Sequence, residues 1–248
     1  MSFDPINDPM GQAIHDYYYQ KKCNKLVVKS DIAEDDNIEV SYLFREFNLM
    51  PKLEKTALKN CRGRVLDVGA GAGCHSLWLQ QKQLSVTALE ISPLTTEVLT
   101  LRGIKRVLMS NFFDAPSNET YDTLLFLMNG IGIAQTLNKL PLFFEKCKQL
   151  LNRDGQILLD SSDLIYLYGN DVEGYLIDLT GAYYGEVTYQ LRYGRIKGNP
   201  FPWLFIDFQT LTDYALKAGF KCELMELGKH FDYLAKLTLF NNSLSFHK

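Results

Sequence analysis

The middle of the chain alternates between short, almost wholly apolar runs and longer segments whose apolar residues recur with helical spacing. The apolar runs predict buried strands at 64–68, 85–90, 106–109, 122–128 and 155–160. The segments between them predict helices at 74–83, 93–101 and 139–151. Strands that alternate with helices in this way predict an α/β protein with a doubly wound, mostly parallel sheet and right-handed crossovers.

The residues ahead of this region have a different pattern. Apolar residues follow a helical spacing over 8–24, 40–47 and 51–60, and an acidic, turn-like stretch at 31–37 separates the first two segments. We therefore expect residues 1–60 to form an N-terminal helical cap.

The alternation of strands and helices stops after Asp163. Residues 165–185 are rich in Tyr and Gly, and two strand-like runs follow at 186–192 and 203–207. This pattern predicts a β-hairpin insertion at about 164–207 rather than a separate domain.

The last part of the chain predicts a helix at 208–218 and two strands at 220–227 and 232–240. The connection between these strands is short, so we expect them to pair as an antiparallel hairpin. Residues 61–248 are then one α/β domain that carries the insertion.

Composition narrows the class of protein. The chain has 248 residues, 46% of them hydrophobic, which is enough for one sizeable core. A formal net charge of -3 with scattered lysines provides no basic surface for nucleic acid. The sequence has neither an apolar run of the roughly 18 residues that a membrane span needs nor the features of a secretory signal at its start. Five dispersed cysteines without a C-x-x-C pair fit reduced thiols, so we expect a cytoplasmic protein.

The most informative segment is Val65-Leu66-Asp67-Val68-Gly69-Ala70-Gly71-Ala72-Gly73, a buried strand that runs into a glycine-rich turn. Glycines at alternate positions allow a sharp turn and let a ligand lie against bare backbone. The helix predicted next would direct its first amides at that ligand. Glu90 ends the following strand, where an acid can accept hydrogen bonds from a ribose hydroxyl pair. The turn therefore predicts a nucleotide-like cofactor.

The spacing of the glycines bears on which cofactor is bound. A dinucleotide turn has the pattern G-x-G-x-x-G, but Cys74 stands where its last glycine would fall and Gly73 comes one residue early. Asp67, two residues ahead of the first glycine, would be a poor neighbour for a pyrophosphate and a good one for an amine-bearing, cationic cofactor. These departures argue against NAD.

The segment Asp67-Val68-Gly69-Ala70-Gly71-Ala72-Gly73 resembles the first motif of the class I S-adenosylmethionine-dependent methyltransferases, an acid followed by G-x-G-x-G. The resemblance extends over about residues 64–163 and implies a Rossmann-like, seven-stranded sheet with an antiparallel C-terminal hairpin. Asn111-Phe112 resembles the pair that contacts adenine, although the family often has Asp where Asn111 stands. The cofactor-binding residues that the resemblance implies are Asp67, Gly69, Ala70, Gly71, Gly73, Glu90, Ile91, Asn111, Phe112, Met128 and Asn129.

The end of the fourth predicted strand bears on the methyl acceptor. Methyltransferases of nucleic-acid bases often carry Asn-Pro-Pro-aromatic here, whereas this chain has Asn129-Gly130-Ile131-Gly132. The segment is more similar to that of small-molecule methyltransferases, with Asn129 facing the transferable methyl group. Asn129 would serve equally well as a cap of the next helix.

Transfer from a sulfonium needs alignment of the acceptor more than a catalytic group, so in-line displacement without covalent catalysis is expected. Asp163 and Asn129 are candidate catalytic residues, and a turn-capping role is slightly favoured for Asp163. Aromatic residues could surround the acceptor, although packing is their commoner role: Tyr166, Tyr168, Tyr183, Tyr184 and Trp203 of the insertion, and Tyr17, Tyr18 and Tyr19 beside His15.

The four histidines, His15, His75, His230 and His247, lack the spacing of metal ligands, and no metal is expected. His75 could lie near the carboxylate of the cofactor or be a first-turn helix residue without a chemical role. Three alternatives stay open: an NAD-dependent oxidoreductase, an S-adenosylmethionine-binding regulatory module without activity, and methylation of a protein. The sequence also leaves a homodimer open.

Overall fold

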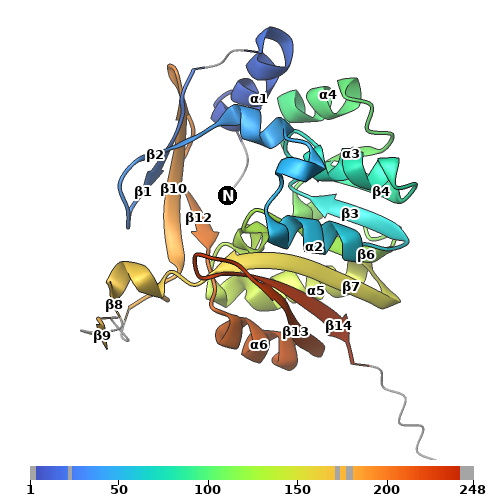
Figure 1. Cartoon of the computed structure of the whole chain (residues 1–248), viewed down its shortest axis with the longest axis vertical. Helices are drawn as coiled ribbons and strands as arrows, with labels where there is room; N and C mark the ends of the chain where they lie inside the picture. The colour runs from blue at the N-terminus through green and yellow to red at the C-terminus, as the bar shows by residue number, and fades with distance from the viewer. Residues whose placement is uncertain (1–3, 22–23, 171–173, 177–180, 241–248) are drawn as a thin grey trace, which may run out of the picture.

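A seven-stranded sheet forms the centre of the computed structural model, which describes residues 4–21, 24–170, 174–176 and 181–240 (Figure 1). The strand order is β13-β14-β7-β6-β3-β4-β5. Strands β3 to β7 are parallel, and β14 is antiparallel to both of its neighbours. The strands are β3 (Arg64–Val68), β4 (Ser85–Glu90), β5 (Val107–Met109), β6 (Tyr121–Phe126), β7 (Leu151–Ser162), β13 (Phe220–Leu227) and β14 (Asp232–Leu239).

Helices cover both faces of this sheet. Apolar residues of α2 and α3 pack on one face, and apolar residues of α5 and α6 pack on the other with most of the large aromatic core. The helices are α1 (Pro9–Gln20), α2 (Lys52–Asn60), α3 (Cys74–Gln81), α4 (Pro93–Leu101), α5 (Leu140–Leu150) and α6 (Phe208–Lys217). The prediction of a doubly wound, mostly parallel sheet with an antiparallel C-terminal hairpin is confirmed.

Strand β3 pairs with β4 on one side and with β6 on the other, so the strand order reverses there. In sheets of this type, ligands bind beyond the carboxyl ends of the strands at such a switch point. A ligand site is therefore expected among the residues that follow the parallel strands β3, β4, β5, β6 and β7.

Of the predicted boundaries that differ from the observed ones, two have a structural cause. β6 ends at Phe126 because Met128 and Asn129 adopt left-handed φ values of 63° and 56°, which a strand cannot continue through. β7 begins at Leu151, four residues earlier than predicted, because the chain becomes extended directly after α5.

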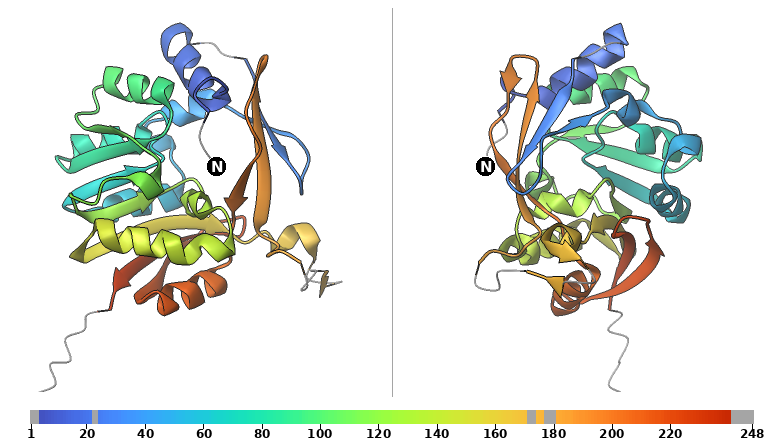
Figure 2. Two further views of the ribbon diagram at one scale, coloured as in Figure 1. Left: turned by 180° about the vertical axis from the view of Figure 1, so that it is seen from behind. Right: turned by 60° about the vertical axis from the view of Figure 1, so that its left-hand side comes forward.

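A second, smaller sheet lies across from the carboxyl ends of the parallel strands (Figures 1 and 2). We call it the cap sheet; it contains β1 (Leu26–Ser30), β2 (Asp36–Ile38), β10 (Glu186–Tyr193), β11 (Ile196–Lys197) and β12 (Phe201–Leu204). The hairpin predicted in the insertion is β10 and β12, which pair antiparallel, although β12 covers Phe201–Leu204 and not 203–207. Strands β1 and β2 were not predicted, so the N-terminal part of the chain is not wholly helical.

Other short elements complete the described chain. The segment predicted as one helix at 40–47 forms the 3-10 helices η1 (Val40–Phe44) and η2 (Phe47–Leu49). Further 3-10 helices are η3 (Phe112–Asp114), η4 (Gly130–Ala134), η5 (Leu137–Lys139) and η6 (Ile165–Tyr168), and a two-stranded ribbon joins β8 (Gly169–Asn170) to β9 (Gly174–Tyr175). The division of the chain into a cap at 1–60 and a domain at 61–248 stays a prediction.

Two helix caps attach the N-terminal segment to the sheet edge. Asp8 caps α1 by accepting a hydrogen bond from Gly11 N at 2.8 Å, and it also accepts one from the Ser92 hydroxyl. Ser92 in turn caps α4 by accepting from Thr95 N at 3.1 Å. This link fixes the start of α1 beside the end of β4, where the cofactor acid was expected.

Candidate active site

The glycine turn after β3 leaves bare backbone facing open space. Gly69, Gly71 and Gly73 have φ values of +70°, +53° and +84°, a region that residues with a Cβ rarely adopt. A Cβ on Gly69 would meet no atom within 4 Å, and one on Gly71 would meet only a backbone oxygen at 4.0 Å. Gly73 serves packing instead, because a Cβ there would lie 2.6 Å from the side chain of Leu99.

Glu90 holds this turn against the end of β4. One carboxylate oxygen accepts from Gly71 N at 3.0 Å, and the other accepts from Ile91 N at 2.8 Å and Ser92 N at 3.3 Å. Burial raises the pKa of Glu90, and the three amides oppose that rise. Because an ionised carboxylate has about four acceptor positions, Glu90 keeps capacity for a ligand hydroxyl.

Asp67 lies beneath the turn rather than in the open space above it. Its side chain is 2% exposed and accepts a hydrogen bond from the Ser76 hydroxyl at 2.6 Å. Burial raises the pKa of Asp67, and the neighbouring His75 and Ser76 oppose that rise. A direct contact between the Asp67 carboxylate and a ligand is therefore not available in this arrangement.

Asn111 and Phe112 follow β5, and both side chains make contacts within the protein. The carbonyl oxygen of the Asn111 side chain caps η3 by accepting from Phe113 N at 2.9 Å. The Phe112 ring is 1% exposed and packs against Phe126 and Phe143, so only its main chain can face a ligand. A pocket of about 490 Å³, lined by Asn111, Phe113 and residues of α5, opens next to this pair.

Asn129 binds the protein with both ends of its side chain. Its amide nitrogen donates to the Leu204 carbonyl of β12 at 3.1 Å, and its amide oxygen accepts from the Ser161 hydroxyl of β7 at 2.9 Å. Asn129 makes no side-chain hydrogen bond to η4, so the capping alternative is wrong. The amide instead joins the cap sheet to the edge of the central sheet, beside the exposed Met128.

Asp163 has the turn-capping role that was slightly favoured. One carboxylate oxygen accepts from Ile165 N at 2.9 Å and from the Tyr184 hydroxyl at 2.7 Å. Tyr183 donates to Asp207 at 2.7 Å, and Tyr168 donates to the main chain of Tyr184 at 3.0 Å. These aromatic residues stabilise the connection between the central sheet and the insertion.

Two further aromatic residues of the insertion lie elsewhere. Trp203 of β12 packs against the backbone of Gly132, where a Cβ would come within 2.1 Å of the indole nitrogen. Tyr166 stacks on Phe231 of the β13–β14 turn, with ring centroids 5.3 Å apart.

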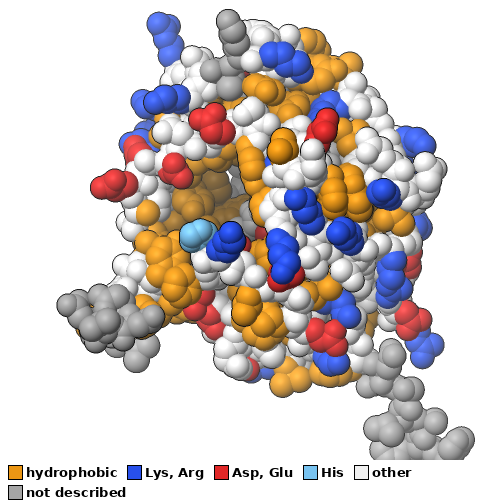
Figure 3. All heavy atoms as spheres, viewed as in Figure 1, with side chains coloured by type: hydrophobic (Ala, Val, Ile, Leu, Met, Phe, Trp, Pro, Cys, Tyr) orange, Lys and Arg blue, Asp and Glu red, His pale blue; other side chains and the backbone are white. Residues whose placement is uncertain are grey.

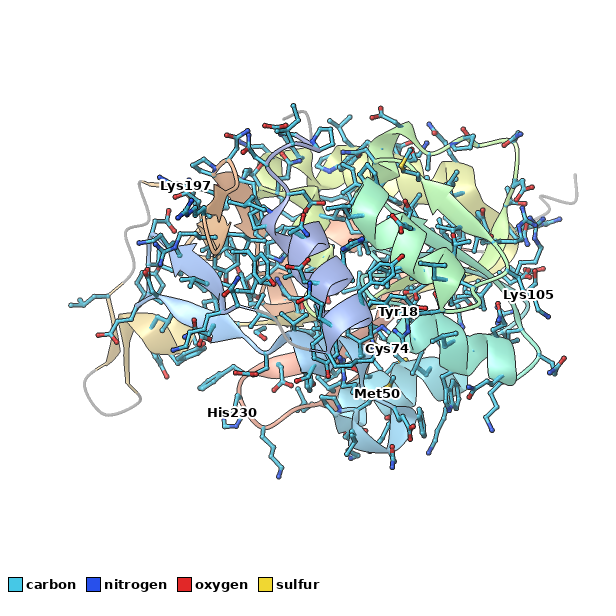
Figure 4. All side chains as sticks on the ribbon, turned by 90° about the horizontal axis from the view of Figure 1, so that it is seen from above. Tyr18, Met50, Cys74, Lys105, Lys197 and His230 are labelled. Atoms are coloured by element: carbon cyan, nitrogen blue, oxygen red, sulfur yellow. The ribbon has the colours of Figure 1, made fainter. Side chains whose placement is uncertain are left out.

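The aromatic residues of α1 hold that helix in place. Tyr17 packs on Phe44 of η1 with ring centroids 4.8 Å apart, and Tyr18 lies against α4, where it donates to the Leu101 carbonyl at 3.4 Å (Figure 4). Tyr19 donates to Glu97 at 3.0 Å and packs on His15. These contacts are structural.

A buried charged cluster at the start of α3 was not predicted. Glu54 of α2 accepts from Arg45 at 2.6 Å and lies 2.9 Å from the Nε2 atom of His75; all three residues are at most 6% exposed. Burial alone would lower the pKa of His75, but Cys74, Glu54 and Asp67 raise it well above its ordinary value. Burial would raise the pKa of Glu54, but His75 and Arg45 lower it.

No sequence pattern could have found this cluster, because its members come from three segments separated along the chain. His75 follows the glycine turn by two residues and is bound to Glu54, so the cluster fixes the first turn of α3.

Two absences hold for the part of the chain that the structure describes. No group of three or more His, Cys, Asp or Glu side chains is arranged to hold a metal ion. None of the described helices has the length and apolar composition of a membrane span. His247 and Cys23 lie outside the described residues.

The strand order, the open glycine turn after β3 and the acid at the end of β4 together define the class I methyltransferase fold. Residues 66–159 match the family model described as a methyltransferase domain. The crystal structure of a SAM-dependent methyltransferase from Bacteroides fragilis, in complex with S-adenosyl-L-homocysteine, is 49% identical to this chain. The match covers 96% of this chain and 98% of that one, with a TM-score of 0.90.

The chain therefore belongs to the S-adenosylmethionine-dependent methyltransferases, and its cofactor is S-adenosylmethionine. This membership decides against an NAD-dependent oxidoreductase.

Two more distant structures share the fold. The sugar N-methyltransferase KedS8 from Streptoalloteichus is 16% identical over 85% of this chain and 97% of its own, with a TM-score of 0.58. The SAM-bound amino pentose methyltransferase CalS10 from Micromonospora echinaspora is 15% identical over 84% and 99%, with a TM-score of 0.55. No curated protein sequence matches the chain.

Proposed function

We propose that this enzyme transfers a methyl group from S-adenosylmethionine to a small-molecule acceptor held between the carboxyl edge of the central sheet and the cap sheet. The observation that carries the proposal is the hollow between these two parts, which Figure 3 shows with hydrophobic side chains gathered along its wall. A hollow closed on one side by a folded sheet suits a compact acceptor better than a polymer.

The inner face of the cap sheet supports an aromatic or apolar environment for the acceptor. Residues directly opposite in an antiparallel pair share a face, so Tyr189 and Phe201 lie on the same side as Val187 and Trp203. On that side Trp203 packs against Gly132 of η4, so this face of the cap sheet is turned to the central domain.

The residues around the glycine turn fit the cofactor. Open backbone at Gly69 and Gly71 gives a ligand room to lie close, and Ala70 is nearly buried beneath. We assign the ribose to Glu90 and Ile91, the adenine to Asn111 and the main chain of Phe112, and the methionine end to the region of Asp67, Met128 and Asn129.

S-adenosylmethionine supplies a methyl group that is already activated on a sulfonium. The chain's own part is then to orient the acceptor, exclude water and, for acceptors that carry a proton, remove it. The Asn129 amide contributes by fixing the cap sheet at the strand ends, which sets the distance across the hollow.

The names of distant structural neighbours are consistent with this acceptor class. KedS8 is a sugar N-methyltransferase and CalS10 an amino pentose methyltransferase, and both are enzymes of the same fold. Fold alone does not fix the acceptor, so the proposal rests on the hollow.

Two measurements test the proposal. Calorimetry with S-adenosylmethionine, S-adenosylhomocysteine and NAD should give binding of the first two only. Transfer of labelled methyl groups is then measured across panels of small metabolites, proteins and nucleic acids. We expect labelled product in the metabolite panel alone; label in the protein or nucleic-acid panel, or in none, would refute a small-molecule methyltransferase.

A further inference from the structure

We propose that Asp160 is the base of this enzyme, the carboxylate that takes the proton from the attacking nitrogen or oxygen of the acceptor. This inference rests on the acceptor site proposed above and adds a catalytic residue to it. Of the two sequence candidates, Asn129 has both ends of its amide bound to the protein, and Asp163 caps a turn and accepts from Tyr184.

Asp160 lies near the end of β7, where the proposed cofactor and acceptor sites meet. Leu159 of β7 pairs with Phe126, the last residue of β6, so Asp160 lies level with the residues that follow β6. Its two carboxylate oxygens accept from Met128 N at 3.1 Å and from Gly130 N at 3.3 Å. The left-handed turn after β6 therefore wraps around this carboxylate.

The same turn contacts the cap sheet. Asn129, between the two amides that bind Asp160, donates to the carbonyl of Leu204 in β12, and Gly132 supports Trp203. Asp160 consequently lies at the junction of the central sheet and the wall of the hollow, which is where an acceptor would approach the strand ends.

The hydrogen bonds of Asp160 leave it able to accept a proton. Its donors are the main-chain amides of Met128, Asn129 and Gly130, so about one of its four acceptor positions stays free. In the described part of the chain no Lys, Arg or His makes an ion pair with it. The residue as a whole is partly exposed, in contrast to the enclosed Asp67.

The surroundings of Asp160 favour its neutral form. Burial raises its pKa to about 7, Glu54 adds to the rise, and the amides of Gly130 and Met128 oppose it. A base whose pKa lies near the working pH is efficient, because it is available as carboxylate and still binds the proton. The titratable groups that interact with it are Glu54 of α2, which is paired with Arg45 and His75, and Tyr233 of β14.

In the proposed step the acceptor gains a methyl group and loses a proton. The acceptor nitrogen or oxygen forms a bond to the methyl carbon while the carbon–sulfur bond breaks and its electron pair goes to sulfur. The proton of the acceptor moves to a free carboxylate position on Asp160 and then leaves to solvent. No oxidant or other co-reactant is needed.

The first test of this proposal needs no acceptor. Carbon-13 NMR of the full chain labelled at aspartate should show one carboxyl that titrates near pH 7 and disappears in Asp160→Asn. Calorimetry with S-adenosylhomocysteine should give the same affinity for wild type and Asp160→Asn within about threefold. Asp154→Asn, an exposed acid at the other end of β7, is the matched control.

The second test uses the acceptor that the metabolite panel identifies. Loss of a general base lowers kcat by about 100-fold or more, so we expect such a loss in Asp160→Asn, with KM unchanged and the acidic limb of the pH profile removed. An ordinary Asp160 pKa, or a tenfold loss of S-adenosylhomocysteine affinity, would overturn the proposal. Full activity of Asp160→Asn would also overturn it and leave the proposed function intact, whereas an inactive wild type would contradict both.

Discussion

At the scale of single residues, a comparison of two glycines separates the cost of backbone strain from the effect on cofactor binding. Gly69 and Gly103 both have positive φ, +70° and +89°, and a Cβ on either would meet no atom within 4 Å. Substitution by Ala at each should cost about 1–2 kcal/mol of unfolding free energy. Only Gly69→Ala places a methyl group where the cofactor is expected, so it alone should weaken S-adenosylhomocysteine binding, by more than about tenfold.

Calorimetry and thermal unfolding of these two variants check the prediction. Equal S-adenosylhomocysteine affinities for Gly69→Ala and Gly103→Ala would mean that the cofactor does not approach the backbone of Gly69.

The buried charged cluster at the start of α3 gives a second residue-scale prediction. Glu54→Gln would leave Arg45 and His75 buried without their carboxylate, which should cost about 3–5 kcal/mol of unfolding free energy. The lowered pKa of Glu54 gives stability that is present above 4.5 and lost as the pH falls. The raised pKa of His75 gives stability that is complete below 6.5 and lost as the pH rises through its folded value.

The difference in stability between wild type and Glu54→Gln should therefore be largest between pH 4.5 and 6.5. Urea unfolding at several pH values measures it. Glu119→Gln removes an exposed carboxylate that pairs with Arg64 and Arg106, and this control should change stability far less. A difference independent of pH would argue that the cluster is not ionised.

Among the predicted cofactor residues, the sequence indicated best those whose conformation is set locally. The conformation of the turn at Gly69 and Gly71 and the acid at Glu90 follow from short-range patterns. Glu54 and Asp160 were missed because their meaning depends on neighbours that only folding brings close. For the same reason the side chain of Phe112 lies in the core, although the resemblance had implied a contact with adenine.

At the scale of elements, buried parallel strands were predictable and the cap strands were not. The apolar runs at 64–68 and 85–90 coincide with β3 and β4 because strands covered on both faces are apolar throughout. β1 and β2 are short and partly exposed, and β1 pairs with a strand from the insertion, Leu26 opposite Tyr193. Pairing between strands so far apart in the sequence produces no local hydrophobic pattern from which the strands could be predicted.

The contact between η4 and β12 gives a prediction at this scale. Gly132→Ala should displace Trp203, because the added methyl group would overlap the indole. The chain has two tryptophans, so in a Trp78→Phe background the fluorescence of Trp203 reports the change directly. We expect a shifted emission, unchanged S-adenosylhomocysteine affinity and about tenfold lower kcat/KM for the acceptor.

A compensating substitution controls for general damage. Trp203→Ala should remove the overlap, so that Gly132→Ala has little further effect in that background, a non-additive result typical of residues in contact. Additive losses in activity would mean that the two positions act independently.

At the scale of the whole molecule, the central sheet binds the cofactor, and the cap sheet combines two segments that are far apart in the sequence. The N-terminal segment is joined to the central domain through Asp8 and Ser92, and the insertion is joined through Asn129 and the tyrosines near Asp163. The hollow proposed for the acceptor is therefore shaped by residues of both segments, which explains why the sequence indicated the cofactor but not the identity of the acceptor.

This arrangement predicts that the cap sheet can open without loss of the cofactor site. Val28→Pro in β1 would remove a main-chain donor from a strand that pairs on both sides, with β10 and β2. Hydrogen exchange should then show lost protection along β10, while β3 and β6 keep theirs and S-adenosylhomocysteine still binds. Acceptor turnover should fall because the wall of the hollow is no longer held. Loss of protection in β3 and β6 as well would show instead that the cap sheet and the central sheet unfold as one cooperative unit.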